Sequence, residues 1–282
     1  MNRWTPWIRT LVILASAWLG TGLPGQAQTL LAGWTFNSQG SQTAALTADQ
    51  GTLAGTVLSL TGTGLTLNGD GTVGLGTGAV LYTNAINSTA QPTLLSNVTI
   101  WVSFTLTGAP GAPNNAIFGL TTATPYLSAS NAGVAGAVAL AYQVNTGPQV
   151  RVIGTYSDNT TVFGPGSGLT PITVGTQNSA AIVFSKNTSY ADDTNGTFHS
   201  QTPTAMATLD AFTDFAIGRL FSSGNDGAIT VNEVRIYDGA MTSTQIAGLS
   251  PTPVPEPGAA WLLAPALLAW MGVRRRPRFL PR

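Results

Sequence analysis

The stretch Val98-Thr-Ile-Trp-Val-Ser-Phe-Thr-Leu106 decides the fold of this chain. Successive side chains of a β-strand point to opposite faces, so every second residue shares a face. One face of this stretch is entirely apolar and consists of Val98, Ile100, Val102, Phe104 and Leu106. The other face carries Thr99, Ser103 and Thr105. This alternation predicts a strand that forms one wall of a hydrophobic core.

Shorter stretches with the same alternation lie on both sides of it, separated by Gly, Pro and Asn. They predict strands at Leu30–Phe36, Val57–Leu60, Ala116–Leu120, Val134–Val144, Val150–Tyr156, Ala180–Phe184, Phe215–Leu220 and Ala228–Tyr237. Many short strands with almost no helical periodicity favour an all-β chain, folded as an antiparallel two-sheet sandwich or a barrel. One short helix is expected at Thr242-Ser-Thr-Gln245, which has the form of a capping box.

The composition fits such a fold and excludes several kinds of site. Only 8% of the 282 residues are charged, whereas about 25% is usual, and 33 are glycine. The absence of cysteine excludes disulfides, thiolate metal sites and cysteine nucleophiles. The single histidine, His199, follows Asn195-Gly196, a favoured dipeptide for a hairpin turn. A solvated hairpin is therefore expected there rather than a metal site.

The charges balance over the whole chain, with 11 basic and 11 acidic residues, but they are unevenly distributed. Seven of the basic residues lie in the first ten or the last nine positions. Between residues 28 and 250, ten acidic residues face four basic ones. Nucleic-acid binding depends on clustered Lys and Arg. We therefore expect no nucleic-acid partner.

Residues 1–27 have the three parts of a secretory signal peptide and predict a helix that signal peptidase removes. Arg3 and Arg9 form the charged start, Leu11–Leu19 the apolar core, and Gly25-Gln-Ala27 a cleavage site with small residues at its ends. The alternative is an uncleaved anchor helix. The apolar run is short for an anchor, because a membrane span needs about 20 residues.

The other end of the chain carries a second targeting sequence, which follows a Pro-rich linker at residues 251–257. Residues 258–282 comprise an uncharged apolar stretch, predicted to be a hydrophobic helix, and an Arg-rich tail. The apolar stretch is short for a resident membrane helix and long enough for transient insertion. A basic cluster holds its end of such a helix on the cytoplasmic side. The motif residues are Pro255, Glu256 and Pro257, and the basic cluster is Arg274, Arg275, Arg276 and Arg278.

This three-part tail resembles the PEP-CTERM sorting signal of exopolysaccharide-producing Gram-negative bacteria. The resemblance implies that an exosortase, a membrane transpeptidase-like enzyme, recognises Pro255-Glu256-Pro257 and removes the tail. The protein would pass transiently through the inner membrane and end at the cell surface or in the extracellular matrix. The alternative is a plain C-terminal anchor helix.

Residues 28–250 carry a second resemblance. Trp34-Thr-Phe36 lies in the first predicted strand, Leu67-Asn-Gly-Asp-Gly71 forms a turn, and Val231-Asn-Glu-Val-Arg-Ile-Tyr-Asp-Gly-Ala240 leads into the predicted helix. These features resemble the laminin-G-like, concanavalin A-like jelly roll. The resemblance implies one domain whose first strand, near Trp34, lies beside its last, near Ile236. Between residues 107 and 179 the family pattern does not align, so the sheet order there stays open.

Glu233 and Arg235 are expected to form a structural ion pair. Regular alternation places Val231, Glu233, Arg235 and Tyr237 on one face of the last strand, and Asn232, Val234 and Ile236 on the other. Glu233 and Arg235 could pair with each other or with residues of the adjacent strand. Glycosidases need two carboxylates about 5 to 9 Å apart. Glu233 is the only glutamate between residues 28 and 250, and no predicted strand carries two acids on one face, so no enzyme activity is expected.

Oxygen-donor side chains in loop segments indicate one candidate metal site. Calcium takes carboxylate and carbonyl oxygens, and laminin-G-like domains often hold one calcium ion at the rim of the sandwich. The competing interpretation is that Asp and Asn form these turns for purely local reasons. The candidate ligands are Asp158, Asp192, Asp193, Asn225 and Asp226.

These features predict an exported, non-catalytic surface or matrix protein that binds or packs against extracellular polysaccharide. Aromatic residues near the predicted strand ends are candidates for stacking on sugar rings, with a place in the core as the other interpretation. They are Tyr126, Tyr142, Tyr156, Phe163 and Tyr190. The open alternatives are an envelope glycan hydrolase and a purely structural coat protein.

Overall fold

The computed structural model describes residues 28–76, 79–107, 115–121, 138–143, 149–155, 162–163, 170–185, 189–201, 211–218 and 229–250. The predicted signal helix, the linker with the Pro-Glu-Pro motif and the hydrophobic C-terminal helix lie outside these residues. Among the residues described, no helix is long and apolar enough to cross a membrane.

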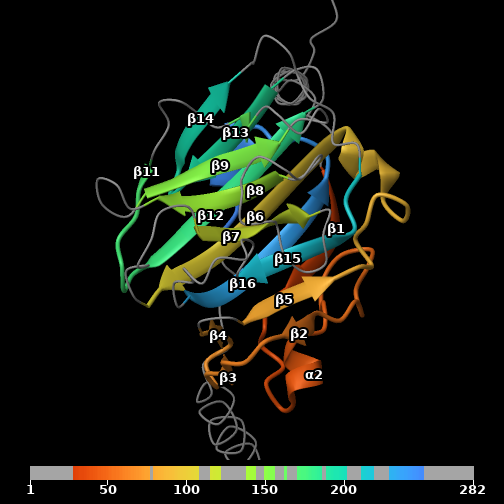
Figure 1. Cartoon of the computed structure of the whole chain (residues 1–282), viewed down its shortest axis with the longest axis vertical. Helices are drawn as coiled ribbons and strands as arrows, with labels where there is room; N and C mark the ends of the chain where they lie inside the picture. The colour runs from red at the N-terminus through yellow and green to blue at the C-terminus, as the bar shows by residue number, and fades with distance from the viewer. Residues whose placement is uncertain are drawn as a thin grey trace, which may run out of the picture.

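The chain folds into two antiparallel β-sheets stacked on each other (Figure 1). The first sheet has the strand order β14-β13-β12-β6-β16-β4-β3, and β1 also pairs with β16. These strands are β1 Thr29–Trp34, β3 Leu65–Leu67, β4 Val73–Leu75, β6 Asn97–Leu106, β12 Gln177–Ser185, β13 Ser189–Thr194, β14 Thr197–Gln201 and β16 Ile229–Asp238.

The second sheet has the order β10-β9-β8-β7-β15-β5-β2, and β11 also pairs with β9. Its strands are β2 Ser59–Thr61, β5 Val80–Thr83, β7 Asn115–Thr121, β8 Val138–Gln143, β9 Gln149–Thr155, β10 Val162–Phe163, β11 Thr170–Pro171 and β15 Asp214–Gly218. The described helices are short: α2 Gln42–Ala45, the 3-10 helix η1 Pro92–Leu95, and α3 Ser243–Ala247. The prediction of an all-β, two-sheet antiparallel jelly-roll sandwich is confirmed.

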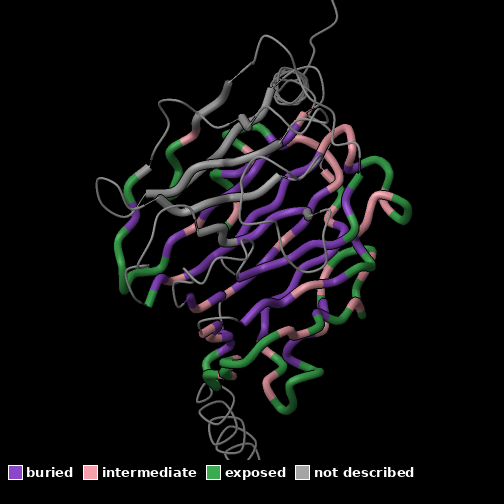
Figure 2. Tube along the Cα trace, viewed as in Figure 1, coloured by how far each residue is buried: buried purple, intermediate pink, exposed green. Residues whose placement is uncertain are grey.

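The core lies between the sheets, and β6 forms its central wall. Figure 2 shows buried residues running along the middle strands. The alternating apolar residues of β6, from Val98 to Leu106, belong to this core, as the alternation predicts. Trp34 of β1 stacks on Phe215 of β15, with ring centroids 5.9 Å apart. The core therefore joins the first strand of one sheet to the other sheet.

β1 and β16 lie side by side, which confirms the expected closeness of the first and last strands. Trp34 pairs with Val234, and Ala32 pairs with Ile236. The β16 strand also pairs with β6, so it holds a central position in the first sheet.

A β-bulge in β16 corrects one detail of the predicted alternation. The register shifts between Val231 and Glu233, which leaves Asn232 as an extra residue. Val231 is consequently buried in the core together with Val234 and Ile236. The prediction that Val231 shares a face with Glu233 was wrong, because one inserted residue reverses the alternation beyond it.

The outer face of β6 and β16 is covered by a second cluster. Trp101 and Tyr237 pack there with Met241 and with Ile246 of α3. The expected capping box begins α3: the Thr242 hydroxyl accepts a hydrogen bond from the backbone N–H of the third helical residue, whose side chain accepts one from the backbone N–H of Thr242. The sandwich is therefore apolar on both sides of its central strands.

β13 and β14 form a hairpin around Asn195 and Gly196, which have φ angles of 51° and 82°. Positive φ at both positions is typical of a type I′ turn. Asp192 and Asp193 lie in β13, and Asp192 is the register partner of His199. Their predicted place in a loop was wrong, because the turn consists of Asn195 and Gly196 and the strand continues up to it.

Candidate functional site

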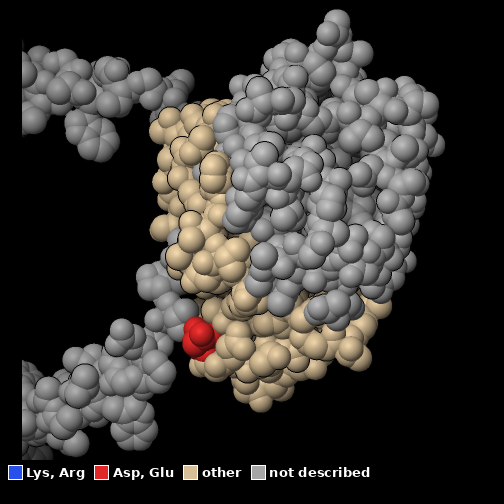
Figure 3. Space-filling model, turned by 60° about the vertical axis from the view of Figure 1, so that its left-hand side comes forward, with Lys and Arg blue, Asp and Glu red and all other residues tan. Residues whose placement is uncertain are grey.

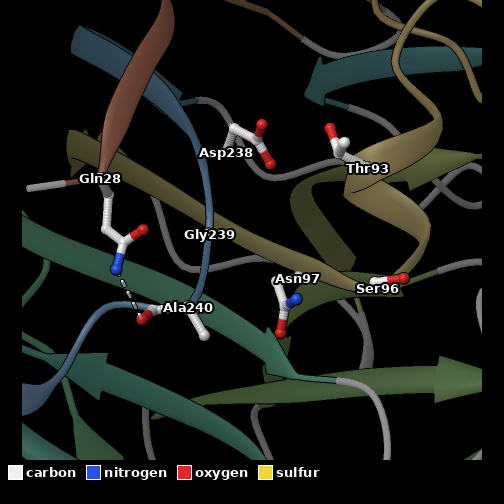
Figure 4. A pocket seen from close by; sticks show the side chains of 7 residues that line it. All are labelled: Gln28, Thr93, Ser96, Asn97, Asp238, Gly239 and Ala240. Atoms are coloured by element: carbon white, nitrogen blue, oxygen red, sulfur yellow. Dashed lines mark hydrogen bonds between the residues drawn. The ribbon is translucent and has the colours of Figure 1, made fainter. Parts of the chain in front are cut away.

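A polar pocket of about 460 Å³ opens where β1, β6 and β16 meet at one rim of the sandwich (Figure 4). This volume is within the range of small-molecule sites, about 300 to 1,000 Å³. The described residues that line the pocket are Gln28, Thr93, Ser96, Asn97, Asp238, Gly239 and Ala240.

Strand register brings these residues together from distant parts of the chain. Asp238 ends β16 and pairs with Thr29 of β1 on one side and with Val98 of β6 on the other. Gln28 directly precedes Thr29, and Asn97 directly precedes Val98. Gln28 and Asn97 therefore flank Asp238 from two neighbouring strands.

The η1 helix forms the opposite wall of the pocket. It contributes Thr93, and its C-terminal cap is Ser96. In Figure 4 both side chains lie across the pocket from Gln28. The neighbouring strand β12 orients the amide of Asn97, because its Oδ1 accepts a hydrogen bond of 2.9 Å from the Ser185 hydroxyl. This bond fixes which end of the amide is the oxygen, and Nδ2 is the donor at the other end.

The Gln28 side chain is held in place at the pocket wall by two contacts. Its Nε2 donates a hydrogen bond of 3.3 Å to the carbonyl of Ala240. Gly239 has a φ of 126°, and a Cβ at this position would overlap the Gln28 side chain. The backbone conformation therefore favours glycine at this position, and a Cβ there would displace the end of the Gln28 side chain.

The turn beyond the pocket is fixed by Thr99 of β6. The Thr99 hydroxyl donates to the carbonyl of Gly239, 2.8 Å away, and accepts from the N–H of Met241, 2.9 Å away. Thr99 is fully buried. The Gly239 and Ala240 backbone is thus held by the sheet.

The pocket is suited to hydrogen bonding and carries one acidic group. Asp238 is the only ionisable side chain among the described lining residues. Charged side chains are also sparse on the face of the molecule that Figure 3 shows, which has one acidic spot and no basic side chain within the part that the structure describes. Hydroxyl and amide groups both donate and accept, and a carboxylate only accepts. This arrangement can bind a ligand rich in hydroxyl groups.

Glu233 and Arg235 lie away from the pocket and are paired with each other. Arg235 Nε donates to Glu233 Oε1 at 2.7 Å. Arg235 also lies over the Trp101 ring, 5.0 Å from its centroid, and its Nη2 donates to the Ser250 carbonyl at 3.0 Å. Glu233 is 2% exposed. The pair thus connects β16 to the covered outer face and to the end of the described chain.

Burial and pairing shift the pKa values of this cluster. Burial alone would lower the pKa of Arg235, but the hydrogen bond and charge of Glu233, together with Tyr237, outweigh it, and the net shift is upward. Burial raises the pKa of the Tyr237 hydroxyl, and the charge of Arg235 opposes this only in part. Arg235 is therefore held as a cation and Tyr237 as a neutral phenol.

The candidate calcium ligands are not brought together in the described structure. Asp192 and Asp193 are neighbours in β13, whereas Asp158, Asn225 and Asp226 lie outside the described residues. No group of three or more His, Asp or Glu residues suited to a metal ion occurs within the described ranges.

Other predicted residues fall partly outside the described chain. These include the sorting motif Pro255-Glu256-Pro257, the basic cluster from Arg274 to Arg278, and two of the candidate stacking aromatics, Tyr126 and Tyr156. Tyr142, Phe163 and Tyr190 lie in β8, β10 and β13 respectively.

Sequence reasoning missed the pocket residues altogether. Gln28, Asn97 and Asp238 lie at strand ends, and the sequence shows no spacing that connects them. The only local signal was the Asp238-Gly239 dipeptide at the end of the last predicted strand, which is typical of a turn. The site appears only once the register of three strands is known.

No known family model matches the chain, and no characterised protein matches it in sequence. Solved structures do share its fold. The Trypanosoma rangeli sialidase in complex with sialic acid has a TM-score of 0.55 at 14% identity, covering 87% of this chain and 39% of the sialidase. The receptor-binding domain of botulinum neurotoxin C/D mosaic serotype has a TM-score of 0.54 at 11% identity, covering 77% of this chain and 50% of the other.

A third structure is matched along nearly its whole length. It is domain 4 of AbnA, a GH43 extracellular arabinanase from Geobacillus stearothermophilus, in complex with arabinotriose. The TM-score is 0.51 at 16% identity, covering 78% of this chain and 98% of that domain. The chain spans half or less of the sialidase and toxin chains. At these identities the likeness shows the fold alone.

Proposed function

We propose that residues 28–250 form a non-catalytic glycan-binding module of an exported protein, which exosortase processing leaves at the cell surface or in the extracellular matrix. The observation that carries the glycan-binding proposal is the polar pocket at the rim of the sandwich. It presents hydroxyls from Thr93 and Ser96, an amide from Asn97 and the carboxylate of Asp238.

Sugar hydroxyls both donate and accept hydrogen bonds, and these four side chains offer complementary groups. Asp238 can accept from two hydroxyls, whereas the oriented Asn97 amide can donate. Two structures of the same fold belong to proteins that were solved with a sugar ligand, sialic acid in one and arabinotriose in the other. They support the class of ligand proposed here.

The described carboxylates support binding rather than hydrolysis. Two carboxylates must flank a glycosidic bond for acid–base catalysis, and Asp238 is the only one among the described residues of the pocket. Glu233 is buried and paired with Arg235. Asp49 binds the backbone and hydroxyl of Thr35. These acids therefore have structural roles.

The predicted targeting sequences at the two ends of the chain support export. The proposed processing partners are signal peptidase at residues 1–27 and an exosortase at Pro255-Glu256-Pro257, with transient membrane insertion of residues 258–273. Extracellular polysaccharide is then the ligand class that the exported module would meet.

Calorimetry with the exported protein tests the glycan-binding proposal. The ligands are a panel of neutral and acidic oligosaccharides, together with the polysaccharide of the producing cell. We expect wild-type binding and a loss of about tenfold or more in Asp238→Asn, which removes the anionic acceptor (about 1.4 kcal/mol). Asp70→Asn is the matched control, because Asp70 binds Thr72 in a turn and does not line the pocket. Absence of binding, or equal binding by both variants, would contradict the proposal.

A further inference from the structure

We propose that removal of the signal peptide completes the pocket, by placing the new N-terminus of the protein in its wall. This inference rests on the export proposed above. Cleavage after Ala27, at the predicted site, makes Gln28 the first residue of the exported protein. Gln28 is also a lining residue of the pocket. The processing site and the candidate binding site therefore meet at one residue.

The cleavage changes the chemistry at the pocket wall. Signal peptidase hydrolyses the bond between the Ala27 carbonyl carbon and the Gln28 nitrogen, and water supplies the hydroxyl that makes Ala27 a carboxylate. The nitrogen leaves as an amine and is mostly protonated at neutral pH, because an α-amino group has a pKa of about 7.7 to 8.0. One neutral N–H donor thereby becomes an ammonium group with three donors.

The fold places this ammonium at the end of the strand that pairs with Asp238. Thr29 and Asp238 are register partners, and Cα atoms of antiparallel partners lie about 4.5 to 5.5 Å apart. Gln28 directly precedes Thr29, the first residue of β1. Its side chain is fixed by the bond to the Ala240 carbonyl and by its packing on Gly239. The register therefore places the new amino group on the neighbouring strand, one residue beyond the partner of Asp238, where its charge acts on the one ionisable side chain that lines the described pocket.

The pairing also indicates a ligand class. Before cleavage the described pocket carries the single negative charge of Asp238, and afterwards it carries an ammonium and a carboxylate with no net charge. Such a pair offers donors and acceptors to neutral sugar hydroxyls. A sugar carboxylate would have to lie near Asp238, where like charges repel. We therefore expect neutral oligosaccharides to bind more tightly than those with uronic or sialic acid units.

The first experiment needs no ligand. The full chain is expressed and exported by a Gram-negative host, and N-terminal sequencing should return Gln28. The α-amino group is then titrated through its reaction with an amine reagent. Its pKa should be lower in Asp238→Asn than in the wild type, because the carboxylate that favours the ammonium is gone, and should be unchanged in Asp70→Asn. A different N-terminus, or equal titration in Asp238→Asn, overturns the inference.

The second experiment removes the charge without a substitution, and it also removes Nε2, which binds the Ala240 carbonyl. Glutaminyl cyclase lets the Gln28 amine attack its own side-chain Cδ and expels ammonia, which leaves a neutral lactam. We expect affinity for a neutral oligosaccharide to fall about tenfold. Gln28→Ser also lacks Nε2 but keeps the ammonium and cannot cyclise. It should therefore bind more tightly than the cyclised wild type, and the same treatment should leave its affinity unchanged. Unchanged binding after complete cyclisation would contradict a role of the N-terminus in the pocket. It would leave the proposal of a glycan-binding module intact. If no glycan binds at all, the proposed function fails, and the amine titration still decides this inference.

Discussion

Glu233 is the only glutamate of the sandwich, and its surroundings assign it a structural role. It is buried, accepts from Arg235 Nε at 2.7 Å, and lies beside the bulge at Asn232. Arg235 in turn contacts Trp101 and the Ser250 carbonyl. A general acid must instead face a substrate together with a second carboxylate. The ion pair therefore stabilises the closing strand and the cluster that covers it.

Replacing Glu233 with Gln should lower stability and leave glycan binding unchanged. The neutral amide cannot compensate the buried guanidinium, and we expect a loss of about 1 to 3 kcal/mol in the free energy of unfolding. Urea denaturation measures it, with Asp70→Asn as the matched surface control. An unchanged midpoint would contradict the structural role. Hydrolysis of polysaccharide by the wild type that disappears in a well-folded Glu233→Gln protein would instead favour an enzyme.

Tyr237 gives the cluster a dependence on alkaline pH. Burial raises the pKa of its hydroxyl, so the folded state favours the protonated phenol. This stabilisation is fully present below the unfolded pKa of about 10 and is lost as the pH rises through the folded value. We expect the free energy of unfolding to fall above about pH 10, and Tyr237→Phe to lack this component. Urea denaturation across that range tests it, and identical slopes for the two proteins would refute it.

At the scale of elements, the free edge of β1 is covered by the loop that follows α2. The N–H groups of Thr52 and Leu53 donate to the carbonyls of Leu30 and Leu31. An uncovered edge strand invites pairing with other chains, so this contact protects the sheet. Gly51 makes the approach possible, because a Cβ there would lie 2.5 Å from the Leu31 carbonyl oxygen.

Gly51 and Gly55 form a matched pair for testing this contact. Both have positive φ, 90° and 96°, but a Cβ at Gly55 would meet open space. Gly55→Ala should lose only the cost of a strained backbone, on the order of 1 kcal/mol. Gly51→Ala adds a backbone clash and should lose clearly more. Urea midpoints compare them, and equal losses would show that the loop moves freely away from β1.

At the scale of the whole molecule, the core is built from residues between Leu31 and Ile236, and the outer cluster continues to Leu249. Both described ends of the chain are tied to the same part of the sandwich. Gln28 binds Ala240, and Ser250 accepts from Arg235. The two ends of the described chain are therefore held by the same region of the sandwich.

We expect the mature protein to lack Met1–Ala27 and the tail beyond Pro257. Each end carries a targeting sequence that its processing enzyme would remove, and the described members of the two clusters that stabilise the sandwich lie between Leu30 and Leu249. Intact-mass measurement on protein recovered from the cell surface decides this. A mass that still includes Arg274 to Arg282 would refute processing of the tail.

Period-two alternation was enough to predict the strand at Val98–Leu106, because the alternation of side chains is a property of each strand by itself. The capping box at Thr242 and the turn at Asn195-Gly196 were predictable for the same reason: their hydrogen bonds and φ angles are local. The bulge at Asn232 was not, because its position depends on how β16 pairs with β6. The pocket depended on tertiary structure entirely, since Gln28, Asn97 and Asp238 meet only when three strands from distant parts of the chain pair in one register.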